Sequence, residues 1–132
     1  MKYNLITFFL VVTMMSCDNS DTMKVVSLHG TYEGVFFRTT NGSRDQTSYV
    51  TVTFDENKFE GSGSIVKYPA ICNGTYTLAG NEVEFVNLCV WTADFDWSFI
   101  LSGKFTITKN GNEIILTRQI NNDVRDTYKL TR

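Results

Sequence analysis

The sequence has few of the residues that most often carry enzyme chemistry. Its 132 residues include one histidine, His29, so a metal site or a catalytic arrangement built from several histidines is excluded. None of the three cysteines forms a Cys-x-x-Cys pair, which argues against zinc and thioredoxin-like sites. Asp94 and Asp96 lie two residues apart, but paired carboxylates become an acid and a base only in a defined geometry. We therefore expect no enzyme activity, no metal and no cofactor.

Neither sign of charge is in large excess. Twelve basic and fourteen acidic residues give a formal net charge of −2, and no basic stripe is present that would neutralise phosphates, so nucleic acid is excluded as a partner. Apolar residues make up 42% and aromatic residues 14% of the chain, enough for one folded core. Only one proline is present, whereas Thr, Val, Ile, Tyr and Phe are abundant. This composition predicts an all-β domain.

Long hydrophobic runs are absent as well. The apolar run from Leu5 to Met14 follows Lys2 and has about ten residues, roughly half of what a membrane-spanning helix needs. A run of this length after a positive start is typical of a cleavable signal. The alternative is a short hydrophobic helix in the core. We predict that residues 1–16 are a signal peptide.

The residues that follow the run resemble the lipobox of bacterial lipoproteins. In Met14-Met15-Ser16-Cys17 a small residue directly precedes the cysteine. The resemblance implies that the Cys17 thiol carries acyl chains such as palmitate, that the signal is cut before it, and that the protein is held on a membrane. Residues 17–28 would form a flexible lipidated tether. The resemblance implies a location in the cell envelope, with the outer membrane favoured and the leaflet open. The alternative is a secreted protein in which Cys17 forms a disulfide.

From Gly30 onward the hydrophobic pattern has a period of two. Turn signals recur every 8 to 12 residues or so, the spacing of a meander, sandwich or barrel. Short hairpins in succession favour an antiparallel up-and-down barrel of about eight strands, closed or nearly closed, over residues 29–132. The predicted strands are residues 30–40, 47–55, 58–68, 72–79, 82–90, 96–108, 113–118 and 124–131.

Two tight turns set the register of their hairpins. A turn centred on Asn110-Gly111 places Ile107 opposite Ile114 and Phe105 opposite Leu116, and one centred on Glu56-Asn57 places Phe54 opposite Phe59. Apolar residues meet apolar residues in both hairpins. The predicted inward face is Val50, Val52, Phe54, Phe59, Ile65, Tyr76, Leu78, Val83, Phe85, Trp97, Phe99, Leu101, Phe105, Ile107, Ile114, Leu116, Val124, Tyr128 and Leu130. Gly61 and Gly63 alternate on that face, where they would allow a bend or leave room for a bulky group.

A third turn, Gly80-Asn81, pairs Tyr76 with Phe85 and brings Cys72 opposite Cys89. Counted from a two-residue loop, Cys72 and Cys89 fall on a non-hydrogen-bonded pair, for which the Cα separation of about 4.5 Å suits a disulfide. Export to an oxidising compartment would permit this disulfide. Pairing of Cys72 with Cys89 would leave Cys17 as the odd cysteine. The alternative is two free buried thiols.

The whole pattern from residue 30 to the C-terminus resembles the short lipocalin-like domains of bacterial lipoproteins. The resemblance lies in the opening Gly30-Thr31-Tyr32, the successive hairpins and the closing Tyr128-Lys129-Leu130. True lipocalins have Trp where this chain has Tyr32. The resemblance implies a barrel that binds a small apolar ligand or serves as an accessory module at the envelope.

One segment breaks the strand pattern. Residues 91–97 place aromatic side chains beside acidic ones, which suits a ligand mouth or a protein contact. The plainer interpretation is that both tryptophans belong to the core and the aspartates are solvated. The rival function is thus a protein-interaction subunit of an envelope complex with no small ligand. The candidate contact residues are Trp91, Asp94, Phe95, Asp96 and Trp97.

Overall fold

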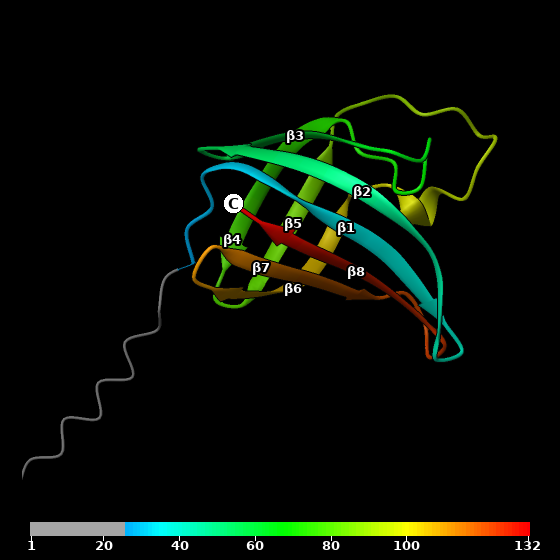
Figure 1. The fold of residues 1–132 in the computed structure, drawn as a ribbon. Helices are drawn as coiled ribbons and strands as arrows, with labels where there is room; N and C mark the ends of the chain where they lie inside the picture. The colour runs from blue at the N-terminus through cyan, green and yellow to red at the C-terminus, as the bar shows by residue number, and fades with distance from the viewer. Residues whose placement is uncertain (1–25) are drawn as a thin grey trace, which may run out of the picture.

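The computed structural model describes residues 26–132 of the chain. Eight antiparallel strands, each paired with the next along the chain, form a barrel that β8 closes by pairing with β1 (Figure 1). The predicted all-β, up-and-down closed barrel is confirmed. The predicted signal peptide, Cys17 and most of the predicted tether lie outside the described residues.

Two-residue turns follow β1, β2, β4 and β6, and longer connections follow β3, β5 and β7. Four predicted boundaries are wrong by three residues or more: β2 begins already at Ser43, β3 ends at Gly63, β5 ends at Asn87, and β6 begins only at Gly103. The residues that follow β3 and β5 belong to two loops that bury apolar side chains against one end of the barrel. The elements are β1 Gly30–Thr40, β2 Ser43–Asp55, β3 Lys58–Gly63, β4 Asn73–Ala79, β5 Glu82–Asn87, the short 3-10 helix η1 Trp97–Phe99, β6 Gly103–Asn110, β7 Glu113–Gln119 and β8 Val124–Thr131.

Two of the three predicted registers are confirmed. Phe54 pairs with Phe59, and Tyr76 pairs with Phe85. The third is wrong, because Ile107 pairs with Leu116. The turn between β6 and β7 is centred on Gly111-Asn112, with positive φ at Gly111, the first central position, as a type II′ turn requires. Moving the turn centre by one residue shifts the pairing by two, so apolar residues still share the inward face.

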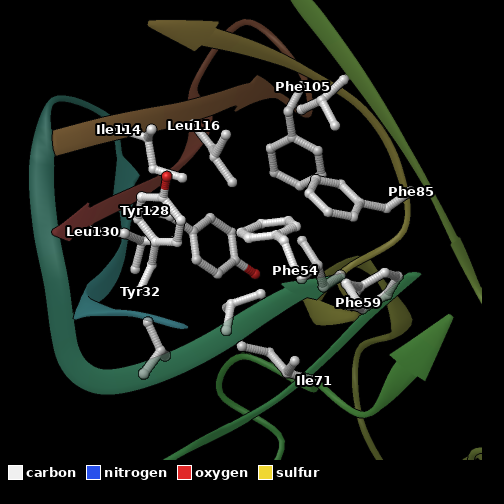
Figure 2. Close-up of a cluster of buried hydrophobic side chains, with 14 of the residues drawn as sticks. Tyr32, Phe54, Phe59, Ile71, Phe85, Phe105, Ile114, Leu116, Tyr128 and Leu130 are labelled. Atoms are coloured by element: carbon white, nitrogen blue, oxygen red, sulfur yellow. The ribbon is translucent and has the colours of Figure 1, made fainter. Parts of the chain in front are cut away.

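Aromatic rings fill the interior. Phe36 lies 4.7 Å from Tyr128, which lies 5.8 Å from Phe105, and the row continues through Phe85 to Phe59 at centroid separations of 5.6 and 5.1 Å. Figure 2 shows several of these rings side by side among aliphatic side chains. Most of the predicted inward residues are buried in this core. The core therefore extends through the barrel as packed side chains.

Two residues of the predicted inward face lie elsewhere. Trp97 is 56% exposed because it lies on η1, outside the sheet, and Val124 is only half-buried at the barrel rim. Thr127, which alternates with the inward-facing Asp126 and Tyr128, is buried on the outer face beside Phe37. Phe37 points to the outer face, where the Arg44 guanidinium covers its ring at 3.7 Å.

One of the two glycines of β3, Gly61, makes room for neighbouring atoms. A Cβ on Gly61 would overlap the Thr51 carbonyl oxygen and the Ile71 side chain. Ile71 comes from the β3–β4 connection and is buried in the core. Absence of a side chain at Gly61 therefore lets β3 approach β2 and lets a loop residue fill the space.

The barrel has two different ends (Figure 1). The tether end carries the tight turns after β2, β4 and β6 together with residues 26–29. The loop end carries the connections after β1, β3, β5 and β7. Among the residues described, no helix is long and apolar enough to cross a membrane.

Candidate functional site at the loop end of the barrel

Two long connections meet at the loop end. We call residues 64–72 the first loop and residues 88–102 the second loop. A disulfide joins Cys72 of the first to Cys89 of the second, so the predicted bond is confirmed. The β4–β5 ladder stops at the pair of Gly74 and Asn87. Because the two strands diverge beyond that pair, the Cα atoms of Cys72 and Cys89 are 6.3 Å apart rather than about 4.5 Å.

Further bonds join the loops along their length. The Ala70 amide donates to the Phe99 carbonyl at 3.0 Å, and the Leu101 amide donates to the Ala70 carbonyl at 3.0 Å. The Lys67 ammonium lies 2.7 Å from the Asp94 carboxylate. The covalent bond, the main-chain bridge and the ion pair make the two loops one structural unit.

Side chains of this unit enter the barrel. The Tyr68 ring lies 5.2 Å from Phe36 and 4.8 Å from Phe99. The Tyr68 hydroxyl donates to the Gln46 carbonyl at 3.0 Å, and Leu101 is buried in the core. The loops therefore close this end as a plug made of their own side chains.

A charged cluster lies beneath the plug. Arg38 of β1, Asp126 of β8 and Arg118 of β7 are cross-strand neighbours that face inward. Asp126 is fully buried and accepts from Arg38 Nε at 2.7 Å, from Arg38 Nη2 at 3.0 Å and from Arg118 Nη2 at 2.9 Å. Burial opposes the charge on Arg38, but the hydrogen bond and the charge of Asp126 outweigh it and raise the pKa of Arg38.

The two guanidinium groups also hold the second loop. Arg38 Nη2 donates to the Ser98 carbonyl at 3.3 Å, and Arg118 Nη2 donates to the same oxygen. Arg118 Nη1 donates to the Ser102 carbonyl at 2.6 Å. Arg38 also lies over the Phe99 ring at 3.8 Å. Loop carbonyls that would otherwise be buried without donors are thereby satisfied.

The sequence analysis missed Arg38, Arg118 and Asp126. Each lies two residues from a core aromatic or aliphatic residue on its own strand, so strand alternation alone places all three inward. The informative signal was strand alternation: Arg38 faces the same way as Phe36, and Asp126 faces the same way as Tyr128.

The predicted contact residues are spread over the second loop. Asp94 accepts from Lys67 and Thr92, and the Lys67 hydrogen bond is the main reason that its pKa falls to about 2. Asp96 caps η1 by accepting from the Ser98 amide, which lowers its pKa with help from the Ser98 hydroxyl and Arg38. The aspartates therefore stabilise the loop.

Of the aromatic contact residues, only Trp97 is exposed. Trp91 and Phe95 are half-buried and stack edge to face at 5.8 Å. The Trp97 indole N–H donates to the Thr92 carbonyl at 2.9 Å, which fixes the exposed ring. Trp97 and Val90, whose exposed fraction is 99%, border a hollow of about 430 Å³. We call Val90 and Trp97 the apolar patch. The hollow is lined by Asn87, Cys89, Val90, Trp91, Trp97, Ile100 and Ser102.

His29 lies elsewhere. It borders a hollow of about 620 Å³ on the outer side of β2, β3 and β4, together with Asp55, Lys58 and Glu60. Within residues 26–132, no three His, Cys, Asp or Glu side chains gather as a metal site.

Comparisons with protein-family models, with curated proteins and with solved structures gave no match to this chain. What the protein does is therefore inferred from its own residues and geometry.

Proposed function

We propose that this protein is a lipid-anchored, lipocalin-like lipoprotein of the bacterial envelope that contacts another envelope protein through its loop end. The observation that carries this proposal is a filled barrel with an exposed, rigidly held apolar patch at one end. Exposed tryptophan in a fixed position is typical of protein contact surfaces.

The cysteines support the lipid anchor. Cys72 and Cys89 are joined, so Cys17 in the lipobox-like sequence is left as the odd cysteine. A disulfide also fits a protein that is exported to an oxidising compartment. The anchor would hold the barrel at a membrane, with the outer membrane favoured.

A small apolar ligand has less support. Such ligands need a continuous cavity of roughly 300 Å³ or more. Here, by contrast, the row of rings from Phe36 to Phe59 and the loop residues Tyr68 and Leu101 occupy the interior, and the hollows of about 620 and 430 Å³ open on the outer surface. Protein contact at the surface requires no such cavity.

The position of the patch suits a partner rather than the membrane. Residues 18–25 would connect Cys17 to the tether end and span at most about 28 Å when fully extended. The apolar patch lies at the opposite end of the barrel (Figure 1). A lipid on Cys17 would therefore leave the patch free to face away from the membrane.

The anchor is tested with Cys17→Ala. We expect the wild-type chain to incorporate labelled palmitate and to sediment with membranes, and the variant to do neither. Sedimentation of an unlabelled wild-type chain would contradict lipidation at Cys17.

The contact surface is tested by photo-crosslinking in intact cells. A photoreactive side chain replaces Trp97 in one variant and Thr106, an exposed outer-face residue of β6, in the control. We expect one adduct of defined mass from position 97 and none from position 106. Equal adducts from both positions, or none from either, would contradict a specific contact at the loop end.

A further inference from the structure

The hollow of about 430 Å³ beside the apolar patch is lined by seven residues, and none of them is charged. Both tryptophans of the chain, Trp91 and Trp97, are among the seven. The larger hollow on the outer side of β2, β3 and β4 is different, because the charged residues Asp55, Lys58 and Glu60 border it. An uncharged lining favours an apolar occupant, since a charge buried there would have no partner.

Most polar side-chain atoms of this lining are already engaged. Asn87 uses both ends of its amide on Cys89, with Nδ2 donating to the carbonyl at 2.8 Å and Oδ1 accepting from the amide at 3.3 Å. The Ser102 hydroxyl donates to a main-chain carbonyl at 3.4 Å, and the Trp97 N–H is also bonded within the loop. A ligand that needs many hydrogen bonds, such as a sugar, would therefore find few partners in this hollow.

Trp91 is the exception in the lining. Its indole N–H is buried, and within residues 26–132 it has no hydrogen-bond partner. A buried donor without an acceptor destabilises a protein, and such donors are rare in folded structures. An occupant that lies against Trp91 and brings one acceptor would remove this cost. A main-chain carbonyl beside an apolar side chain meets both requirements.

We propose that this hollow receives one apolar side chain of the partner protein, such as leucine, and that the adjacent main-chain carbonyl accepts from the Trp91 N–H. The hollow opens on the surface beside Val90, which is 99% exposed, so a covering protein would bury the rim together with the occupant. The Cys72–Cys89 disulfide and the hydrogen bond of Trp97 fix the walls beforehand, which lowers the ordering cost of binding. A side chain that fills such a pocket typically anchors an interface. That the occupant belongs to a protein rests on the function proposed above.

Tryptophan fluorescence tests the hollow without the partner, because Trp91 and Trp97 are the only tryptophans of the chain. The full-length chain in phosphatidylcholine bicelles is titrated with N-acetyl-leucine amide. We expect a saturable change of emission and a Kd at least about tenfold lower than for N-acetyl-aspartate amide, which has a similar shape but carries a charge. Equal Kd values, or no saturation with the leucine probe, would overturn the proposal.

A pair of matched variants tests where the probe binds. Val90→Asp places a charge on the rim of the hollow, and we expect it to raise the Kd of N-acetyl-leucine amide at least about tenfold. Val66→Asp is the control, because Val66 is 84% exposed and lies on the first loop outside the lining. Both valines are exposed, so neither change disturbs the core. Equal weakening by the two variants would place the probe outside the hollow and overturn the proposal.

NMR of the two indole N–H groups tests the hydrogen bond, with Trp97→Phe used to assign the two signals. On addition of N-acetyl-leucine amide, we expect the Trp91 signal to move downfield as its proton gains an acceptor. The Trp97 signal should move less, because its N–H keeps the Thr92 carbonyl. A Trp91 signal that stays in place while the emission saturates would overturn the role of the carbonyl.

Photo-crosslinking then separates this proposal from the contact function. We expect the adduct from position 97 to be lost in Val90→Asp and kept in Val66→Asp. An adduct from position 97 without probe binding would overturn the hollow as a site and leave the contact function standing. Probe binding without any adduct would overturn a partner protein as the occupant, and the hollow would then be a site for a free small ligand.

Discussion

The two ends of the barrel are closed by different physical means. At the tether end, Leu28 is buried in the core, the Tyr76 hydroxyl donates to the Leu28 carbonyl at 3.2 Å, and Lys109 donates to the Ser27 carbonyl at 2.8 Å. At the loop end, closure depends on a buried cluster of charges, a disulfide and two loops. The tether end is sealed by one apolar side chain and two hydrogen bonds, whereas the loop end adds a charged cluster and a covalent bond to the apolar packing of Tyr68 and Leu101.

The difference follows from how much main chain each end buries. Only a short segment crosses the tether end, and single side chains satisfy its carbonyls. The plug brings the Ser98 and Ser102 carbonyls over the interior, where they need donors. A guanidinium group offers five N–H donors in a fixed plane, so two arginines serve both carbonyls and Asp126 at once. Asp126 in turn balances the arginine charge.

The largest expected effect is at the loop end. Asp126→Ala removes the carboxylate between two buried guanidinium groups and should lower the free energy of unfolding by about 3–5 kcal/mol. Urea denaturation at pH 7 measures it. As a control, Arg38→Met, Asp126→Leu and Arg118→Met combined should cost less than Asp126→Ala, because no uncompensated charge remains and the remaining loss comes from the Ser98 and Ser102 carbonyls, which lose their donors. If Asp126→Ala were as stable as wild type, the Asp126 carboxylate would not stabilise the two guanidinium groups.

The disulfide should rank second. Cys72 and Cys89 are 17 residues apart in sequence, and removing a bond that closes such a loop should cost about 3 kcal/mol. Urea denaturation of Cys72→Ser with Cys89→Ser measures the loss. Dithiothreitol treatment of the wild type should give a similar loss, and if reduction changed nothing in the wild type, the bond would not contribute to stability.

At the tether end the expected effect is smaller. Leu28→Ala should lower the free energy of unfolding by about 2 kcal/mol, near the low end for buried leucine, because a segment outside the sheet can settle into the space. Ser27→Ala is the matched control, since Ser27 is exposed and its carbonyl still accepts from Lys109. If the two variants were equally stable, the tether end would not be sealed by Leu28.

Much of the barrel was predictable because local rules decide it. Period-two alternation and the turns at Glu56-Asn57 and Gly80-Asn81 fix register, and register brings Cys72 near Cys89. The turn at Gly111 was misplaced by one residue because Asn110-Gly111 and Gly111-Asn112 both satisfy hairpin preferences.

The loop end was less predictable because its contacts join distant residues. Arg38 and Asp126 are 88 residues apart in sequence, and nothing local indicates that they pair. Residues up to Tyr68 were assigned to a strand, whereas residues 64–72 form a loop whose Ile71 fills the space that Gly61 leaves. Trp97 was assigned to the inward face as part of a predicted strand at residues 96–108, whereas its place on η1 exposes it.

The smallest expected effect is a titration at the surface of the loop end. The hydrogen bond from Lys67 is the largest cause of the lowered pKa of Asp94, about 2 against an ordinary 3.8, and Thr92 adds to it. A lowered pKa means that the ionised form is favoured in the folded protein. The pair therefore stabilises the loops above pH 3.8 and loses its effect as the pH falls toward 2. Carboxyl carbon NMR should give a midpoint near 2 for Asp94, and Lys67→Ala should return it toward 3.8. Neither Leu28 nor the Tyr76 hydroxyl that donates to it ionises in acid, so hydrogen-exchange protection of the Leu28 region should not follow this titration. If protection fell equally at the tether end and the loop end over this pH range, charge would not distinguish the two ends.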